Sequence, residues 1–411
     1  MMLQNEATAD RAVASRVAEF YRRHPYPPPV DDLEAYRRTW NDARRRAEAH
    51  LFWPSAPYRE DRRILVAGCG TVQAAHYAVR WPNASVLGVD VSAESVAFTR
   101  ELKERHALDN LEAVVRSLED AGELGGTFDW IVCTGVLHHL PDPDAGLRAL
   151  RAVLAPGGAM HVMVYAPYGR AGIYMLQEYC RRLGIGASDA EIDELAAALR
   201  TLPEDHPIVP LLRESPDFGD VAGMADALLN PQDRAYTAGQ LADLLARNGL
   251  RFGRWIRQAP YLASCGSPAN GPHRPRLAAM DPMDCAAALE LFRGTMVRHS
   301  VVAYRDDEAA LGKVDFDGDA ADRFVPVRIP GTIAVREKLP PGAAAVLLNR
   351  NHTYRDLYLP IDAEQARLFD GIDGVRTIGE LGRQRSAGAQ VQEFFRRLWE
   401  WDQIVVDTSG A

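Results

Sequence analysis

Two glycines and an aspartate carry the strongest chemical signal in this sequence. Gly68 and Gly70 follow the apolar run at 64–67, and Asp90 follows the apolar run at 86–89. Glycines at a strand-to-helix turn let the backbone approach a ligand closely, and an acid at the tip of the next strand can accept both hydroxyls of a ribose. The combination predicts a nucleoside-binding site.

A dinucleotide site of the NAD type is the main competing interpretation of this turn. Such a site needs a third glycine, where the helix approaches the pyrophosphate. Here Gly70 is followed by Thr71 and Val72, and no third glycine appears at the required position. The turn therefore favours a nucleoside ligand that has no pyrophosphate.

The elements that must position these residues are strands alternating with helices. Such alternation is typical of βαβ units and a parallel sheet covered on both faces. Ser92 is expected to cap the helix after the second strand, and Thr237 with Gln240 forms a capping box for a later helix. Seven strands are predicted, the last two as an antiparallel pair: 64–67, 86–89, 111–115, 130–133, 159–164, 250–256 and 300–305.

Helical segments flank and interrupt this α/β domain. Before it, two helices are predicted around the proline-rich hinge 24–29, the second with Tyr36, Trp40, Ala43 and Ala47 on one face. Between residues 167 and 236 lies a mostly helical insertion, in which Ser188 and Glu191 form a capping box. We interpret this insertion as a lid. A further helix is expected around residues 285–297.

After residue 306 the sequence predicts a smaller α+β unit. Strands are expected at 334–336, 345–348 and 404–406, and helices at 363–369, 377–383 and 391–399. This order suggests a winged-helix-like module. The predicted organisation is thus an N-terminal helical cap at 1–60, an α/β domain at 61–306 and a C-terminal domain at 307–411.

Four motifs in this order resemble the class I S-adenosylmethionine-dependent methyltransferases, over roughly residues 60–305. The turn at 67–71 is similar to the first motif of that family, Asp90 to its ribose acid, and 135–143 to its loop beside the reacting methyl group. Residues 128–132 resemble its fourth strand, and 154–158 resemble its turn before the fifth. The resemblance implies a Rossmann-like seven-stranded methyltransferase sheet.

The resemblance also implies S-adenosyl-L-methionine as the cofactor. Two positions depart from the family pattern, because Val66 stands where an acid is usual and Val72 where a third glycine is usual. Carried over position by position, the cofactor-binding residues are Ala67, Gly68, Cys69, Gly70, Asp90, Val91, Ser117, Leu118, Thr134 and Gly135.

Three side chains are candidates for the methyl-transfer step itself. His138 and His139 lie on the loop beside the methyl group, and an imidazole with a pKa near 6.5 can take a proton from a hydroxyl or an amine. Tyr26, in the proline-rich hinge, could reach the same place. Each has a structural alternative: a loop histidine often bonds a backbone carbonyl, and a hinge tyrosine often packs on a helix.

Composition excludes several other classes of protein. The 47 Lys and Arg against 56 Asp and Glu give a net charge of -9 over 411 residues, which does not favour nucleic acid or an anionic membrane. The five cysteines are widely spaced without a C-x-x-C pair, so we expect no disulfide framework and no metal site. We expect a soluble cytoplasmic protein, and a homodimer is compatible with the sequence.

The function that fits these features is methyl transfer to an O or N atom of a small molecule or a peptide. The C-terminal module is loosely similar to the winged-helix domains that recognise leader peptides, although packing or dimerisation explains it equally well. One alternative is a partner-binding protein that retains a silent cofactor fold, which Val66 and Val72 would suit. A second is an RNA methyltransferase, which the negative charge disfavours.

Overall fold

The computed structural model describes residues 13, 15–308, 312–383 and 388–411, and the chain divides into two compact units. The described residues of the first unit fall within 1–37, 60–250 and 293–300. Those of the second fall within 38–59, 251–292 and 301–411. No helix of the described residues is long and apolar enough to cross a membrane. The domain boundaries suggested by the sequence stay predictions.

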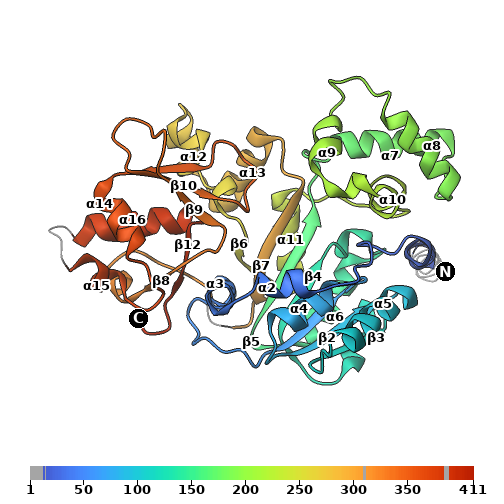
Figure 1. The fold of residues 1–411 in the computed structure, drawn as a ribbon, viewed down its shortest axis with the longest axis horizontal. Helices are drawn as coiled ribbons and strands as arrows, with labels where there is room; N and C mark the ends of the chain where they lie inside the picture. The colour runs from blue at the N-terminus through green and yellow to red at the C-terminus, as the bar shows by residue number, and fades with distance from the viewer. Residues whose placement is uncertain (1–12, 14, 309–311, 384–387) are drawn as a thin grey trace. The chain divides into compact units, whose positions relative to one another are not determined.

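A seven-stranded sheet is the centre of the fold, as predicted, with the strand order β3-β2-β1-β4-β5-β7-β6 (Figure 1). The first five strands in this order, from β3 to β5, pair in parallel with one another, so their carboxyl ends meet at one edge. The strands are β1 (Arg63–Ala67), β2 (Ser85–Asp90), β3 (Leu111–Val115), β4 (Phe128–Thr134), β5 (Leu154–Tyr165), β6 (Leu250–Trp255) and β7 (Arg298–Arg305).

Strand β5 begins earlier than the sequence pattern predicts. The turn expected at 154–158 lies inside the strand, where the pairing with β4 shifts between Phe128 and Trp130. Phe128 faces Leu154, whereas Trp130 faces Ala159, so the intervening residues of β5 bulge from the ladder. Pro156 has no N–H to donate there, and Gly157 adopts a left-handed φ of 71°. The predicted start of this strand was therefore wrong, although the predicted turn at 154–158 coincides with the bulge.

Helices follow the strands of the sheet, and two of them pack against it. Helices α4 and α5 contact β2, and α5 also contacts β3. The predicted caps are confirmed: Ser92 accepts a hydrogen bond from the backbone of Ser95, and Thr237 and Gln240 form a capping box. These helices are α4 (Gln73–Arg80), α5 (Ala93–Arg105), α6 (Pro143–Ala152) and α11 (Ala238–Arg247), with short 3-10 turns at Leu118–Leu124 and Leu137–His139.

The N-terminal segment departs from the predicted pair of helices. Residues 15–23 are helical and precede the proline-rich hinge. The second predicted helix is in fact two, α2 (Glu34–Arg38) and α3 (Asp42–Phe52). Asn41 breaks them apart, because its backbone is extended and its side chain accepts a hydrogen bond from the N–H of Arg44, which starts a new helix. The single stripe from Tyr36 to Ala47 was therefore the wrong interpretation.

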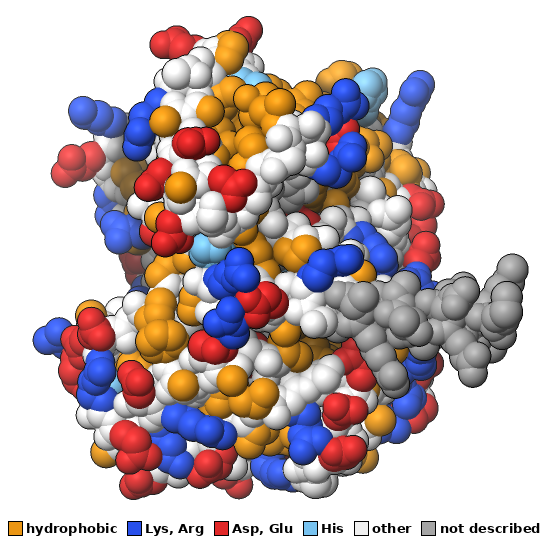
Figure 2. All heavy atoms as spheres, turned by 90° about the vertical axis from the view of Figure 1, so that its right-hand side faces the viewer, with side chains coloured by type: hydrophobic (Ala, Val, Ile, Leu, Met, Phe, Trp, Pro, Cys, Tyr) orange, Lys and Arg blue, Asp and Glu red, His pale blue; other side chains and the backbone are white. Residues whose placement is uncertain are grey.

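The insertion is helical, as predicted, and its hydrophobic core is shared with Phe20 of the N-terminal helix. Ser188 and Glu191 form the expected capping box. Hydrophobic side chains also gather on the outside of this region, in the upper half of Figure 2, and Met175, Tyr179 and Leu183 of α7 are exposed. The helices are α7 (Ala171–Leu183), α8 (Asp189–Leu199), α9 (Val209–Glu214) and α10 (Val221–Leu229), with a 3-10 turn at Pro216–Gly219.

The C-terminal part has two small sheets, one ordered β11-β10-β9 and one pairing β12 with β8. Strands β8 and β11 were not predicted, because each is a four-residue segment with a proline inside. The similarity to winged-helix domains stays a prediction. The strands are β8 (Val325–Arg328), β9 (Thr332–Val335), β10 (Ala345–Asn349), β11 (Tyr358–Ile361) and β12 (Ile404–Asp407).

The remaining helices belong to the second unit. The helix expected around 285–297 is α13 (Pro282–Arg293), which ends at Arg293 because Gly294 takes a left-handed φ of 62°. The others are α12 (Arg274–Ala278), α14 (Ala363–Asp370), α15 (Ile378–Gly382) and α16 (Gly388–Glu400), with 3-10 turns at Ala259–Tyr261, Ser267–Asn270 and Asp319–Arg323.

Candidate functional site

The glycine turn and Asp90 lie next to each other at the carboxyl edge of the sheet. Ala67 at the end of β1 faces Val89 of β2, and the N–H groups of Gly68 and Cys69 donate to the carbonyl of Val89 at 2.8 and 2.9 Å. Parallel pairing of β1 and β2 thus brings together residues that are about twenty positions apart in the chain.

Both glycines of the turn have a backbone conformation that favours glycine. The φ angles are 72° at Gly68 and 52° at Gly70. A Cβ atom on Gly68 would lie 2.3 Å from a methyl group of Val136, and one on Gly70 would lie 2.7 Å from the carbonyl oxygen of Tyr26. The turn therefore leaves no space for side chains, and it is held between the loop after β4 and the N-terminal hinge.

The Asp90 carboxylate is held by backbone donors. Its Oδ2 accepts a hydrogen bond from the N–H of Gly70 at 2.8 Å, and its Oδ1 accepts one from the N–H of Ser92 at 2.9 Å. Burial raises the pKa of the Asp90 carboxyl, and these N–H groups partly oppose that shift. A carboxylate has about four acceptor positions, so it can still accept hydrogen bonds from a diol.

The other predicted cofactor residues surround this pair. The N–H of Arg116 donates to the carbonyl of Asp90 at 2.9 Å, which places Ser117 and buried Leu118 directly beyond β3. Thr134, at the end of β4, accepts a hydrogen bond from the Gln73 side chain at 2.7 Å. Because β3, β2, β1 and β4 are neighbours, one edge of the sheet carries all four segments.

The remaining members of the predicted set differ in exposure. Ala67 and Cys69 are fully buried, and burial raises the pKa of the Cys69 thiol. Val91 is 42% exposed, whereas Gly135 is half-buried with a φ of 80°. Ala67 and Cys69 are thus part of the core under the turn, where the backbone rather than the side chain could meet a ligand.

His138 lies in the short helix after β4 and is fully buried. Its ring centroid is 4.0 Å from that of Tyr165 and 4.2 Å from that of His139. Within the described residues, neither ring nitrogen of His138 has a hydrogen-bond partner. Burial holds the pKa of His138 well below its ordinary value, assisted by the nearby charges of His139 and Arg170, so the ring is neutral at pH 7.

His139 and Tyr26 occupy different surroundings. Nδ1 of His139 lies 2.6 Å from the carbonyl oxygen of Gln232, which is the structural role that a loop histidine commonly takes. Tyr26 is half-buried, and its carbonyl lies against the glycine turn. His138, with its unpartnered nitrogens, is therefore better placed than His139 to meet a ligand.

A buried carboxylate that the sequence pattern did not single out lies beside these rings. Asp226 of α10 is 4% exposed. It accepts hydrogen bonds from the hydroxyl of Tyr21 at 2.7 Å, the hydroxyl of Tyr165 at 3.5 Å and the amide of Asn230 at 3.3 Å. Its signal in the sequence is one acid inside the apolar run at 221–229, which is too small to find without the fold.

Arg170 fixes the other side of Tyr165. Its guanidinium carbon lies 3.5 Å from the centroid of the Tyr165 ring. The same group pairs with Asp233 at 3.3 Å, and both side chains are almost completely buried. Tyr165 is thus held between a cation and the His138 ring.

Replacing His138 with leucine is expected to stabilise the protein and to impair its chemistry. A buried polar ring without hydrogen bonds costs free energy, so an apolar side chain of similar volume should raise the free energy of unfolding by about 1 kcal/mol. Urea unfolding measures this effect, and production of S-adenosylhomocysteine measures turnover. The matched control is His139→Leu, which removes a bonded histidine and should destabilise. Loss of stability in the His138 variant would contradict the argument.

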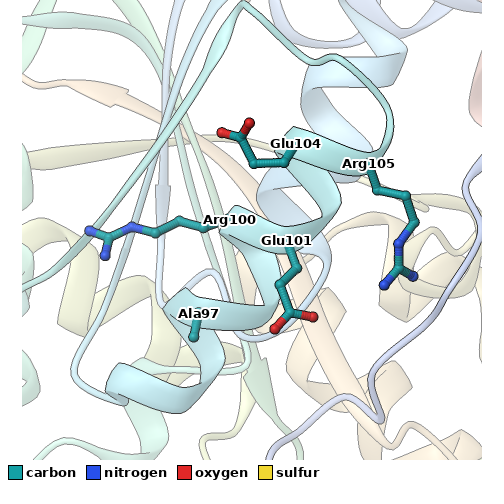
Figure 3. Close-up of a pocket in the computed structure, with 5 residues that line it drawn as sticks. All are labelled: Ala97, Arg100, Glu101, Glu104 and Arg105. Carbon is teal, nitrogen blue, oxygen red and sulfur yellow. The ribbon is translucent and has the colours of Figure 1, made fainter.

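A shallow pocket lies elsewhere, on the outside of α5 (Figure 3). Two of its side chains already have partners: Arg100 donates to the carbonyl of Ala113, and Arg105 donates to that of Asp31. It contains no residue of the predicted site. Its lining residues are Ala97, Arg100, Glu101, Glu104 and Arg105.

Comparison with known proteins agrees with this geometry. Residues 65–160 match the family described as a methyltransferase domain. An uncharacterized protein from Synechococcus sp. is 40% identical over 173 residues, which cover 41% of this chain and 40% of that protein. The ubiquinone biosynthesis O-methyltransferase of Xanthomonas campestris pv. campestris is 34% identical over 150 residues, which cover 34% of this chain and 61% of that protein. The chain thus spans about two fifths to three fifths of these relatives.

Solved structures agree over a longer range. PKMT2 from Rickettsia typhi has a TM-score of 0.62 and 17% sequence identity, and the match covers 93% of this chain and 77% of that one. The same protein in complex with AdoHcy has a TM-score of 0.60. The resemblance indicated by the motifs is confirmed at the level of fold. Residues 65–160 therefore match a methyltransferase domain, and the chain has the class I methyltransferase fold.

Proposed function

We propose that the chain is an S-adenosylmethionine-dependent methyltransferase that modifies an O or N atom of a small molecule or a peptide. The observation that carries this proposal is the pairing of the Asp90 carboxylate with the glycine turn at the carboxyl edge of the sheet. The methyltransferase family match over residues 65–160 supports the reaction class.

The residues at the edge fit an adenosyl group. Asp90 has capacity for the two ribose hydroxyls, and Ser117 and Leu118 follow the neighbouring strand, where they would border the adenine. Gly68 and Gly135 would allow close approach of the backbone. When bound, the cofactor supplies a methyl group on a positively charged sulfur.

The chain's own contribution to methyl transfer would be positioning and exclusion of water. Tyr165 ends β5 and His138 lies in the short helix after β4, where an acceptor would meet the methyl group. A proton acceptor works best when its pKa is near the working pH. The lowered pKa of His138 therefore favours a role in orienting the acceptor by hydrogen bonding, more than one in removing a proton.

The two valines that depart from the family pattern, Val66 and Val72, do not contradict this proposal. Val66 is fully buried in β1, and Val72 at the start of α4 is 4% exposed. Both side chains are therefore taken up by core packing. The silent alternative predicts instead that the turn binds no cofactor.

Titration calorimetry of the full chain with S-adenosylmethionine separates the two alternatives. We expect saturable heat with a dissociation constant below about 1 mM, which corresponds to a binding free energy of about 4 kcal/mol. S-adenosylhomocysteine should compete for the same site, whereas NADH, which carries a pyrophosphate, should not. The absence of heat at millimolar concentrations of the first two ligands would overturn the proposed activity.

A further inference from the structure

The N-terminal helix and the insertion form one body. Phe20 of the helix lies in the same hydrophobic core as Ile173 of α7 and Ile192 of α8. Two hydrogen bonds reinforce this core: the Tyr21 hydroxyl donates to Asp226, and Nε2 of His24 lies 2.8 Å from the carbonyl of Ala187. We call the body formed by residues 15–27 and 171–229 the lid.

The lid lies directly on the glycine turn. The hydroxyl of Thr71 donates to the carbonyl of Pro27 at 2.6 Å, and Thr71 is fully buried. Next to it, the Tyr26 carbonyl and the Pro27 ring fill the space where a Cβ atom on Gly70 would lie, at 2.7 and 3.0 Å. The hinge thus contacts the turn that the proposed function assigns to the cofactor.

The chain beyond the hinge is anchored to the sheet domain. Leu33 is fully buried, and its N–H donates to the His106 ring at 3.3 Å. Tyr36 stacks on His76 with ring centroids 4.0 Å apart, and Arg80 donates to its hydroxyl. Residues 29–32, between the anchored chain and the lid, are exposed. Because they are not packed in a core, these residues can change conformation when the lid moves.

We propose that the lid lifts from the glycine turn to admit and release the cofactor, and that the Thr71–Pro27 hydrogen bond is its latch. The lid would bend at residues 29–32 and at the two connections of the insertion, after β5 and before α11. This inference rests on the proposed function, because it assigns the turn to S-adenosylmethionine. A gate that must open for both entry and exit has a definite kinetic signature. Weakening the latch accelerates association and dissociation by similar factors, since it destabilises the closed state with and without ligand equally.

The test uses three variants of the full chain and S-adenosylhomocysteine as the probe. Thr71→Val removes the latch hydroxyl with little change of shape, whereas Thr71→Ser keeps a hydroxyl. The matched control is Thr99→Val, because the buried hydroxyl of Thr99 bonds the carbonyls of Gly70 and Thr71, which belong to the turn and not to the lid. Rates are measured by rapid mixing of radiolabelled ligand, followed by a chase with unlabelled ligand.

For Thr71→Val we expect both rate constants to rise about fivefold, the change that loss of one buried hydrogen bond produces, while the dissociation constant changes less than twofold. Thr71→Ser should resemble the wild type, and Thr99→Val should not raise both rates. Unchanged rates in Thr71→Val, the same acceleration in Thr99→Val, or faster dissociation alone would overturn the latch. Failure of the wild-type protein to bind the probe would overturn the proposed function instead.

Discussion

Asp90→Ala should weaken S-adenosylmethionine binding by about 10- to 150-fold, or about 1.5 to 3 kcal/mol. This is the cost of losing hydrogen bonds from a ribose to a charged acceptor. The Asp90 carboxylate also bonds the N–H of Gly70, so its removal loosens the turn that carries the ligand. Titration calorimetry with the variant and the wild type measures the difference.

Asp120→Ala is the matched control for this experiment. Asp120 lies shortly after β3, near the same edge of the sheet, but it is exposed. Its removal changes the net charge by the same amount and should leave the affinity within about twofold of the wild type, because exposed charges contribute little in high dielectric. Equal affinities for the Asp90 variant and the wild type would show that the nucleoside site is elsewhere.

Mild acid should destabilise the protein more than its carboxylates explain. Burial lowers the pKa of His76 to about 4 and that of His161 to about 3, and it holds the pKa of His138 well below its ordinary value. Below pH 6.5 these three histidines bind protons in the unfolded chain but stay unprotonated in the folded chain. The stability that these neutral rings provide is complete above pH 6.5 and is lost as the pH falls from 6.5 towards 4.

The expected loss at pH 5 is about 2 kcal/mol for each of His76 and His161, and His138 adds to it; together this is a large share of the stability of a typical domain. The Asp90 carboxyl acts in the opposite direction, because its raised pKa lets the folded state take up a proton more readily. Urea unfolding at pH 7 and pH 5 measures the net effect. His138→Leu should reduce the pH dependence. A free energy of unfolding that is constant from pH 7 to pH 5 would refute this account.

Local pattern was sufficient for the sheet, the glycine turn and the caps. Apolar runs of strand length alternate with helical segments, and Ser92, Ser188 and Thr237 each stand before a helix. These features depend on residues within one turn or one strand of each other, so the sequence contains all the information they need. The position of Asp90 beside Gly70 also follows, because adjacent parallel strands end at one edge.

Only the tertiary structure decided which residues surround Tyr165 and His138, and that the proline-rich hinge lies on the glycine turn. Asp226 meets Tyr21, which is 205 residues away in the chain, and Thr71 meets Pro27, which is 44 residues away. Neither pairing has a periodicity or spacing to reveal it. The short strands β8 and β11 were likewise decided by long-range pairing, with β12 and β10 respectively. Such contacts depend on packing between segments that are distant in the chain. The packing energy is a property of both segments together, so neither segment's sequence predicts it alone.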